Sequence, residues 1–227
     1  MDRAALFLDS FFKPELIART APSILEAMVV TVEIGLLVVV TGLTLGLLLA
    51  ALRSFRVQAV NLAIVIYVDV FRALPPLVLV LLVYFGLPNV GVSLPSLAVL
   101  WLVLSLVLGA FAEEIFWAGI LSVRRGQWEA ARSTGLGFAQ TLAYVVVPQA
   151  IRLTVPPLTN RTIAITKNTA LGSVIGVPEI LNVATTAQSF VGNATPLMLG
   201  ALAYVVLFIP VVVLGRWIET RFAWRRA

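Results

Sequence analysis

The sequence contains no cysteine and no histidine among its 227 residues. A disulfide framework, a thiolate or imidazole metal site and a catalytic centre built on either side chain are therefore excluded. Charged residues make up only 12% of the chain, whereas hydrophobic residues make up 60% and the mean hydropathy is +1.03. Soluble domains carry about 25% charged residues. The composition therefore predicts an integral membrane protein.

The sequence also lacks the phosphate-binding pattern Gly-x-x-x-x-Gly-Lys-Ser/Thr. We therefore expect no cofactor in this chain and no enzymatic activity of its own. If ATP and magnesium take part in its function, they must bind to a separate protein.

Five apolar stretches are long enough to span a bilayer, which takes about 20 residues. They cover residues 24–52, 60–85, 94–121, 157–177 and 196–218. Pro75 and Pro76 should break or kink the second stretch, whereas Pro148, Pro156 and Pro157 should delay the start of the fourth. The sequence therefore predicts an all-α membrane protein with about five transmembrane helices.

Three regions are distinguished by composition. Residues 1–23 mix charged and aromatic side chains without the pattern of a signal peptide, which predicts a segment at the membrane surface. Residues 24–220 form the transmembrane domain, with a polar loop at 121–156, and residues 221–227 form a basic tail. Residues 179–195 are predicted to be a loop or a short surface helix.

Arginine is distributed unequally between the two sets of loops. One set carries Arg53, Arg56, Arg124, Arg125, Arg132 and Arg152 in addition to the tail. The loops at 86–93 and 179–195 carry neither lysine nor arginine. Because basic short loops face the cytoplasm, we expect a periplasmic N-terminus and a cytoplasmic C-terminus.

The polar loop contains a predicted short helix. Residues 127–134 suit about two helical turns, and Gly135 is placed to end them in the left-handed conformation. Ala130 and Ala131 would let another chain approach closely, and Glu129 would offer it an acceptor. Such a helix is suited to docking in a groove of a partner.

The same loop carries a resemblance to a known family. Glu129-Ala130-Ala131, Gly135 four residues after Ala131 and Pro148 further on resemble the EAA loop of permease subunits of bacterial ABC importers. The similarity extends over about residues 25–220. It is closest to the polar amino acid uptake branch in the segments Phe71–Pro75, Gly119–Val123 and Leu171–Glu179.

The resemblance implies a type I ABC importer permease fold and transport of a polar or charged amino acid across the bacterial inner membrane. It implies separate ATPase subunits that bind ATP and magnesium, a second permease subunit, a periplasmic substrate-binding protein, and no nucleic acid. The residues implied in ATPase coupling are Gln127, Trp128, Glu129, Ala130, Ala131, Arg132, Gly135 and Pro148.

Two other functions are open on the residues alone. A secondary transporter or channel would use an ion gradient, but the sequence has no detectable inverted repeat and such a carrier needs no docking helix. A purely structural membrane protein would not need charges at the middle of the bilayer.

Asp69, Glu114 and Lys167 each lie ~15 Å from the cytoplasmic end of their predicted helix, near the midplane. A charge there costs about 2.5–3.5 kcal/mol, so each needs a partner or a purpose. We expect Asp69 to pair with Arg72 and Glu114 with Lys167. The alternative is that these residues, with Glu113, line a substrate path.

The sequence departs from the family at three positions. Glu113 and Trp117 stand where the resemblance leads us to expect a small or polar residue and an arginine, and Arg161 stands where a neutral polar residue is common. The more acidic segment predicts a preference for cationic substrates. Alternatively, Glu113 could pair with a cation such as Arg161 of a second subunit.

Overall fold

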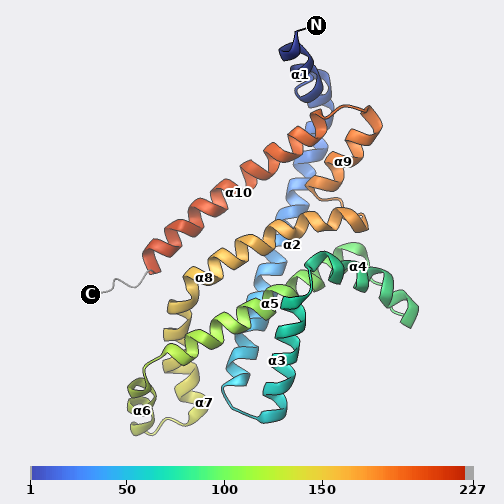
Figure 1. Cartoon of the computed structure of the whole chain (residues 1–227). Coiled ribbons are helices and arrows are strands. Elements are labelled where there is room, and N and C mark those ends of the chain that lie inside the picture. The colour runs from blue at the N-terminus through green and yellow to red at the C-terminus, as the bar shows by residue number, and fades with distance from the viewer. Residues whose placement is uncertain (1, 223–227) are drawn as a thin grey trace.

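The computed structural model describes residues 2–222, so most of the predicted basic tail at 221–227 lies outside the described residues. Within that range the chain is helical and contains no strand (Figure 1). The helices are α1 Arg3–Phe11, α2 Pro14–Arg53, α3 Gln58–Ala73, α4 Pro76–Gly86, α5 Ser96–Ser122, α6 Arg125–Ser133, α7 Phe138–Thr141, α8 Val147–Lys167, α9 Ile180–Val191 and α10 Thr195–Phe222. The all-α prediction is confirmed.

Among residues 2–222, up to five segments can span a membrane. Three helical stretches are long and apolar enough alone, namely Arg3–Arg53, Ser96–Ser122 and Thr195–Arg221. Two further spans arise if each bent pair of helices counts as one, with bends of 104° between α3 and α4 and 41° between the α7–α8 region and α9. This agrees with the predicted number.

Helix α5 lies at the centre of the fold, and α2 packs along it (Figure 1). Leu100, Leu104 and Leu108 of α5 are fully buried in the largest core cluster. Gly46 of α2 lies so close to α5 that an added Cβ would be 2.5 Å from the Cβ of Ala112. Small residues thus allow the close approach of the two helices.

The predicted break in the second span lies at the two adjacent prolines. Helix α3 ends at Ala73, Pro75 caps α4 and Pro76 is its first residue. Proline fixes its own φ angle, has no N–H group and disfavours the helical conformation in the residue before it. The chain therefore changes direction at this point, and the prediction is confirmed.

The fourth span differs from the prediction. Helix α8 begins at Val147 rather than Pro157, and Pro156 and Pro157 lie inside it. Within membrane helices such prolines are tolerated because neighbouring helices and local adjustments compensate for the lost hydrogen bonds. The helix follows a π-helical segment, Leu142–Val146, and continues as a 3-10 segment, Asn168–Ile175.

The N-terminal helices also differ from the predicted boundaries. Helix α2 begins at Pro14, ten residues before the predicted start at Ile24, and accommodates Pro22. The charges at Glu15 and Arg19 had placed this stretch outside the helix, although charged residues are good helix formers.

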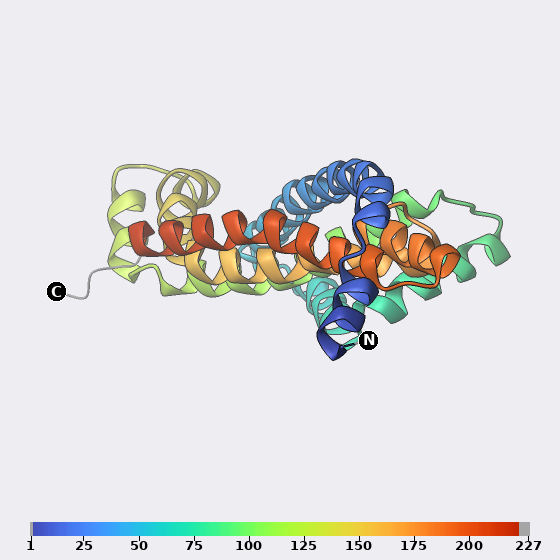
Figure 2. The same ribbon diagram turned by 90° about the horizontal axis from the view of Figure 1, so that it is seen from above.

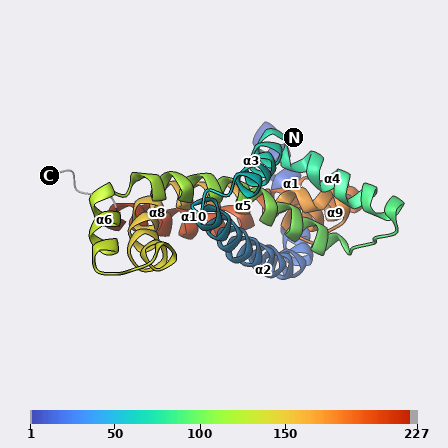
Figure 3. The same cartoon turned by 90° about the horizontal axis from the view of Figure 1, so that it is seen from below.

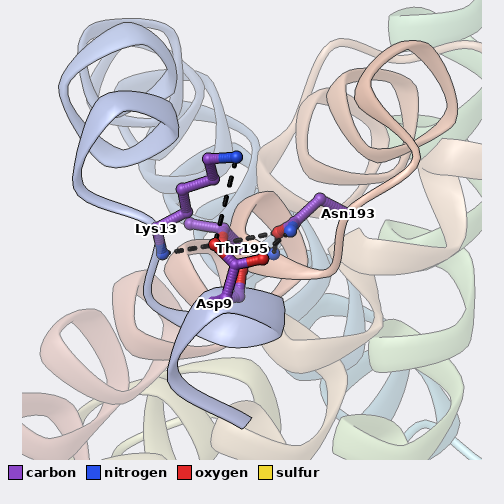
Figure 4. Close-up of polar contacts among 4 residues, drawn as sticks. All are labelled: Asp9, Lys13, Asn193 and Thr195. Atoms are coloured by element: carbon purple, nitrogen blue, oxygen red, sulfur yellow. Dashed lines mark hydrogen bonds and ion pairs between the residues drawn. The ribbon is translucent and has the colours of Figure 1, made fainter. Parts of the chain in front are cut away.

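The N-terminus is held against the turn between α9 and α10 (Figure 4). The side chain of Asn193 donates a hydrogen bond to the carbonyl of Asp9 at 2.9 Å, and the Lys13 backbone N–H donates to the Thr195 hydroxyl at 3.1 Å. The predicted surface segment is thus fastened to residues that follow it by more than 180 positions. The predicted loop or short helix at 179–195 is a helix, α9, whose first N–H groups are capped by Glu179.

The molecule has two distinct ends. Figures 2 and 3 show α6 and the C-terminal end of α10 on the same side of the molecule, whereas α4 and α9 lie toward the opposite side. Helices α5, α8 and α10 run between these ends (Figure 1). The polar loop is therefore far from α4 and α9.

Candidate functional site

The predicted docking helix is present as α6. It spans Arg125–Ser133, and Gly135 follows with a φ angle of 92°. The backbone N–H of Gly135 donates to the carbonyl of Arg132 at 3.1 Å. Glycine reaches this left-handed conformation without a steric penalty, so the predicted cap is confirmed.

An aromatic contact holds α6 in place. The Trp128 ring stacks on Phe138 with 5.5 Å between centroids, and Phe55 meets Phe138 edge-on at 5.3 Å. These ring contacts join α6 to the segment between α2 and α3. Trp128 was predicted to take part in ATPase coupling, and that role stays a prediction. Phe55 and Phe138 were not identified, because no sequence pattern links two aromatic residues 83 positions apart.

The two alanines of α6 differ in exposure. Ala130 is exposed, as are Gln127, Glu129 and Arg132, but Ala131 is only 8% exposed. The prediction that both alanines lie open to a partner is therefore wrong for Ala131, which faces the inside of its own loop. Ala130 marks the open face.

Polar contacts connect the docking helix to its neighbours. Arg125 pairs with Glu129 at 2.9 Å across one helical turn. The Gln149 side chain donates to Gln127 at 3.3 Å and to the Val145 carbonyl at 2.8 Å. Pro148 is exposed in the first turn of α8, directly after the π-helical segment. The loop is therefore linked to the start of a spanning helix.

Glu113 is fully buried and paired with an arginine of another helix. The Arg53 guanidinium donates to both carboxylate oxygens, at 3.0 and 3.3 Å, and lies over the Trp117 ring at 4.8 Å. Such a pair satisfies a charge that would otherwise be costly to bury. Arg53 was assigned only to a basic loop, so this pairing was not predicted.

Glu114 pairs with Arg72 at 2.6 Å, not with Lys167. Asp69 lies exposed on α3, and within residues 2–221 its carboxylate has no ion-pair partner. The predicted pairs Asp69–Arg72 and Glu114–Lys167 are therefore wrong. The physical reason is that α3 directs Arg72 toward α5, a choice that spacing within α3 does not reveal.

Lys167 is exposed at the last residue of α8, with its ammonium 5.9 Å from the centroid of the Phe208 ring. Because α8 begins at Val147, Lys167 lies ~30 Å from the start of the helix, not ~15 Å. Lys167 is thus not part of the Arg72–Glu114 pair and faces Phe208 instead. The predicted path residues form one group on α3 and α5 and a separate lysine near α10.

Arg161 approaches the Arg72–Glu114 group from α8. Its guanidinium carbon lies 3.8 Å from the centroid of the Phe111 ring, and that of Arg72 lies 5.4 Å from the same ring. Both arginines line a pocket of about 270 Å³. Neither Phe111 nor the convergence of two arginines on it was predicted.

These contacts change the expected charge of the path. Glu113 and Glu114 are each paired with an arginine of the same chain, so Glu113 needs no cation from a second subunit. The basis for a preference for cationic substrates is therefore removed, because the acidic segment is already neutralised.

The sequence of this chain was compared with known proteins. Residues 42–224 match the family of binding-protein-dependent transport system inner membrane components. The probable glutamine ABC transporter permease protein of Bacillus subtilis is 34% identical over 157 residues, which cover 69% of this chain and 72% of that protein. The arginine transport system permease protein of the same organism is 30% identical over 202 residues, with coverage of 88% and 92%. The glutamate transport system permease protein of Corynebacterium efficiens is 36% identical over 176 residues, with coverage of 71% and 76%.

Solved structures have the same architecture. An amino acid ABC transporter crystallised with histidines superimposes with a TM-score of 0.81 at 32% identity, and the match covers 90% of this chain and 96% of that one. An inward-facing MetNI methionine ABC transporter gives a TM-score of 0.64 at 22% identity, with coverage of 98% and 99%, and supports the fold alone.

Proposed function

Because this chain belongs to the family of binding-protein-dependent transport system inner membrane components and is therefore a permease subunit of an ABC importer, we propose that it carries a polar or charged amino acid across the bacterial inner membrane. Its fold is that of a type I ABC importer permease. The names of the glutamine, arginine and glutamate permeases among its relatives support the cargo class. One structural observation carries the mechanism: α6 exposes one face and is fastened on the other.

In the mechanism we propose, ATPase subunits dock on the exposed face of α6. Glu129 and Ala130 are exposed there, and a small side chain allows a partner to approach closely. Trp128 fixes the opposite face through Phe138 and Phe55. A displacement of α6 would therefore be transmitted through these rings to the end of α2. The hydrogen bond between Gln127 and Gln149 would transmit it to α8. The partner binds ATP and magnesium, and this chain supplies the mechanical contact.

The importer also needs two further partners. A second permease subunit, identical or paralogous, would complete the path, and a periplasmic substrate-binding protein would deliver the cargo to the end formed by α4 and α9. This orientation places α6 in the cytoplasm, and it is supported by the arginines of the loops at that end.

The docking proposal is tested with Ala130→Trp. The purified permease, its ATPase and its binding protein are reconstituted in liposomes, and amino acid uptake is measured together with ATP hydrolysis. Overfilling a packed contact costs about 1–3 kcal/mol, so we expect binding of the ATPase to weaken by about 5–150-fold and uptake to fall with it. Insertion of the variant should be unchanged because Ala130 is exposed.

Val90→Trp serves as the matched control, since Val90 is 74% exposed and lies beyond α4, away from α6. It should leave binding of the ATPase near wild type. Wild-type uptake by Ala130→Trp would contradict docking on α6. Uptake driven by an ion gradient without the ATPase would instead support a secondary transporter.

A further inference from the structure

The break between α3 and α4 meets α5 and α8 at the pocket of about 270 Å³, which we call the Arg161 pocket. Its lining includes Arg72, Leu74, Pro76, Phe111, Arg161 and Asn168. Pockets for drug-sized ligands begin at roughly 300 Å³. The Arg161 pocket is therefore suited to a molecule of about the size of an amino acid rather than to a larger ligand.

The charges around the pocket do not balance. Arg72 is paired with Glu114 at 2.6 Å, but within residues 2–221 no carboxylate lies within ion-pair distance of Arg161. The Arg161 side chain is half-buried against the Phe111 ring. A ring face attracts a guanidinium group but does not neutralise its charge. Arg72, Arg161 and Glu114 therefore carry one net positive charge.

Other groups at the pocket also favour an anion. Asn168, the first residue of the 3-10 segment that follows α8, also lines the pocket, and a side-chain amide can donate hydrogen bonds. The planar fork of Arg161 matches a carboxylate, which can accept two parallel hydrogen bonds from it.

We propose that the Arg161 pocket binds a carboxylate of the cargo, so that the permease itself favours acidic amino acids over neutral and cationic ones. The inference rests on the proposed function, since it specifies which class of amino acid is carried. An acidic amino acid has a net charge of −1 and balances the surplus positive charge, whereas a cationic one adds to it. The Glu114 side chain is 49% exposed, so its carboxylate is accessible and can accept hydrogen bonds from the ammonium group of the same molecule.

The test compares glutamate with glutamine, which differ in side-chain charge but hardly in shape. Binding of each radiolabelled probe to the purified permease–ATPase complex is measured without the binding protein, whose own specificity would otherwise dominate. Arginine is the third probe. We expect glutamate to bind at least about tenfold more tightly than glutamine, with arginine weakest, because a hydrogen-bonded ion pair replaces a neutral contact.

Arg161→Gln should bring the glutamate and glutamine affinities together while leaving glutamine binding near wild type. Arg161→Lys keeps the charge without the fork and should retain part of the difference. Lys167→Gln is the matched control, because this cation lies on the same helix but faces Phe208 of α10 and does not line the pocket. It should keep the glutamate preference.

Three results would overturn the inference: a wild-type complex that binds none of the probes or binds arginine most tightly, an equal loss for glutamate and glutamine in Arg161→Gln, or the same loss of preference in Lys167→Gln. All affinities are referred to the amount of assembled complex, so poor folding of a variant is recognised separately. The proposed function fails differently, through the absence of ATP-driven uptake of any amino acid by the reconstituted importer.

Discussion

Glu113 is a completely buried carboxylate in a helix of leucines, valines and alanines, and one arginine makes this burial tolerable. Arg53 reaches it from the last residue of α2, where its side chain is still 21% exposed. The pair therefore connects the buried centre of α5 to the end of α2 near the docking loop. Removing one partner leaves the other charge without compensation, and this is usually more damaging than removing both.

This asymmetry gives the first stability prediction. Arg53→Met should lower the free energy of unfolding by about 3–5 kcal/mol, because Glu113 remains buried and unpaired. The double variant Arg53→Met with Glu113→Leu should recover most of the loss. Thermal unfolding of the purified proteins in detergent measures both, and a double variant as unstable as the sum of its single variants would contradict the coupling.

The sequence identified Asp69, Glu114 and Lys167 as charges that need a partner or a purpose, but the partners expected for them were wrong. The free-energy cost of burying a charged side chain depends on that residue and its apolar neighbours in the sequence, so it can be predicted. Pairing depends on which faces of two helices meet, and Arg53 and Glu113 are separated by 60 positions. The single clue was that Arg53 ends an apolar span.

At the scale of helices, the contact between α2 and α5 determines where the charged residues meet. Gly46 and Gly42 lie at the crossing, and Cβ atoms there would contact Ala112 and Leu108 at 2.5 and 2.8 Å. These glycines therefore allow the two helices to pack closely. The break at Pro75 was predictable, because a pair of prolines acts locally. The path of α8 through Pro156 and Pro157 was not, because neighbouring helices compensate for the missing hydrogen bonds.

Because α2 and α5 approach so closely, we predict that one added methyl group at the crossing lowers the free energy of unfolding. Gly46→Ala should destabilise the protein by about 1–3 kcal/mol, since Ala112 and the backbone of Glu113 cannot both move away. Gly86→Ala is the control, because nothing lies within 4 Å of a Cβ at that position and its φ angle is not positive. Unfolding midpoints measured side by side should fall for the first variant only. Equal midpoints would mean that α2 and α5 can separate without cost.

At the scale of the whole molecule, the two proposed sites lie at different places along its length. Helix α6 lies at one end, and α4 and α9 lie toward the other (Figure 1). The Arg161 pocket is lined by residues of α3, α5, α8 and the start of α4. The succession of spans was predictable because hydropathy and loop charge are local properties of the sequence. The pocket was not, because it is formed by three segments spread over almost 100 residues.

The direction in which the molecule crosses the membrane follows from its arginines and can be tested through the absence of cysteine. Because the chain has no cysteine, Val90→Cys and Ala130→Cys each introduce a single thiol at an exposed position of one end. Arginine-rich loops are retained in the cytoplasm, and the loop around Val90 has no basic residue. In cells with a permeabilised outer membrane, a membrane-impermeant maleimide should therefore label position 90 at once and position 130 only after the inner membrane is disrupted. The reverse order would place α6 on the periplasmic side, where no ATPase subunit could reach it. It would therefore contradict both the predicted orientation and the docking mechanism.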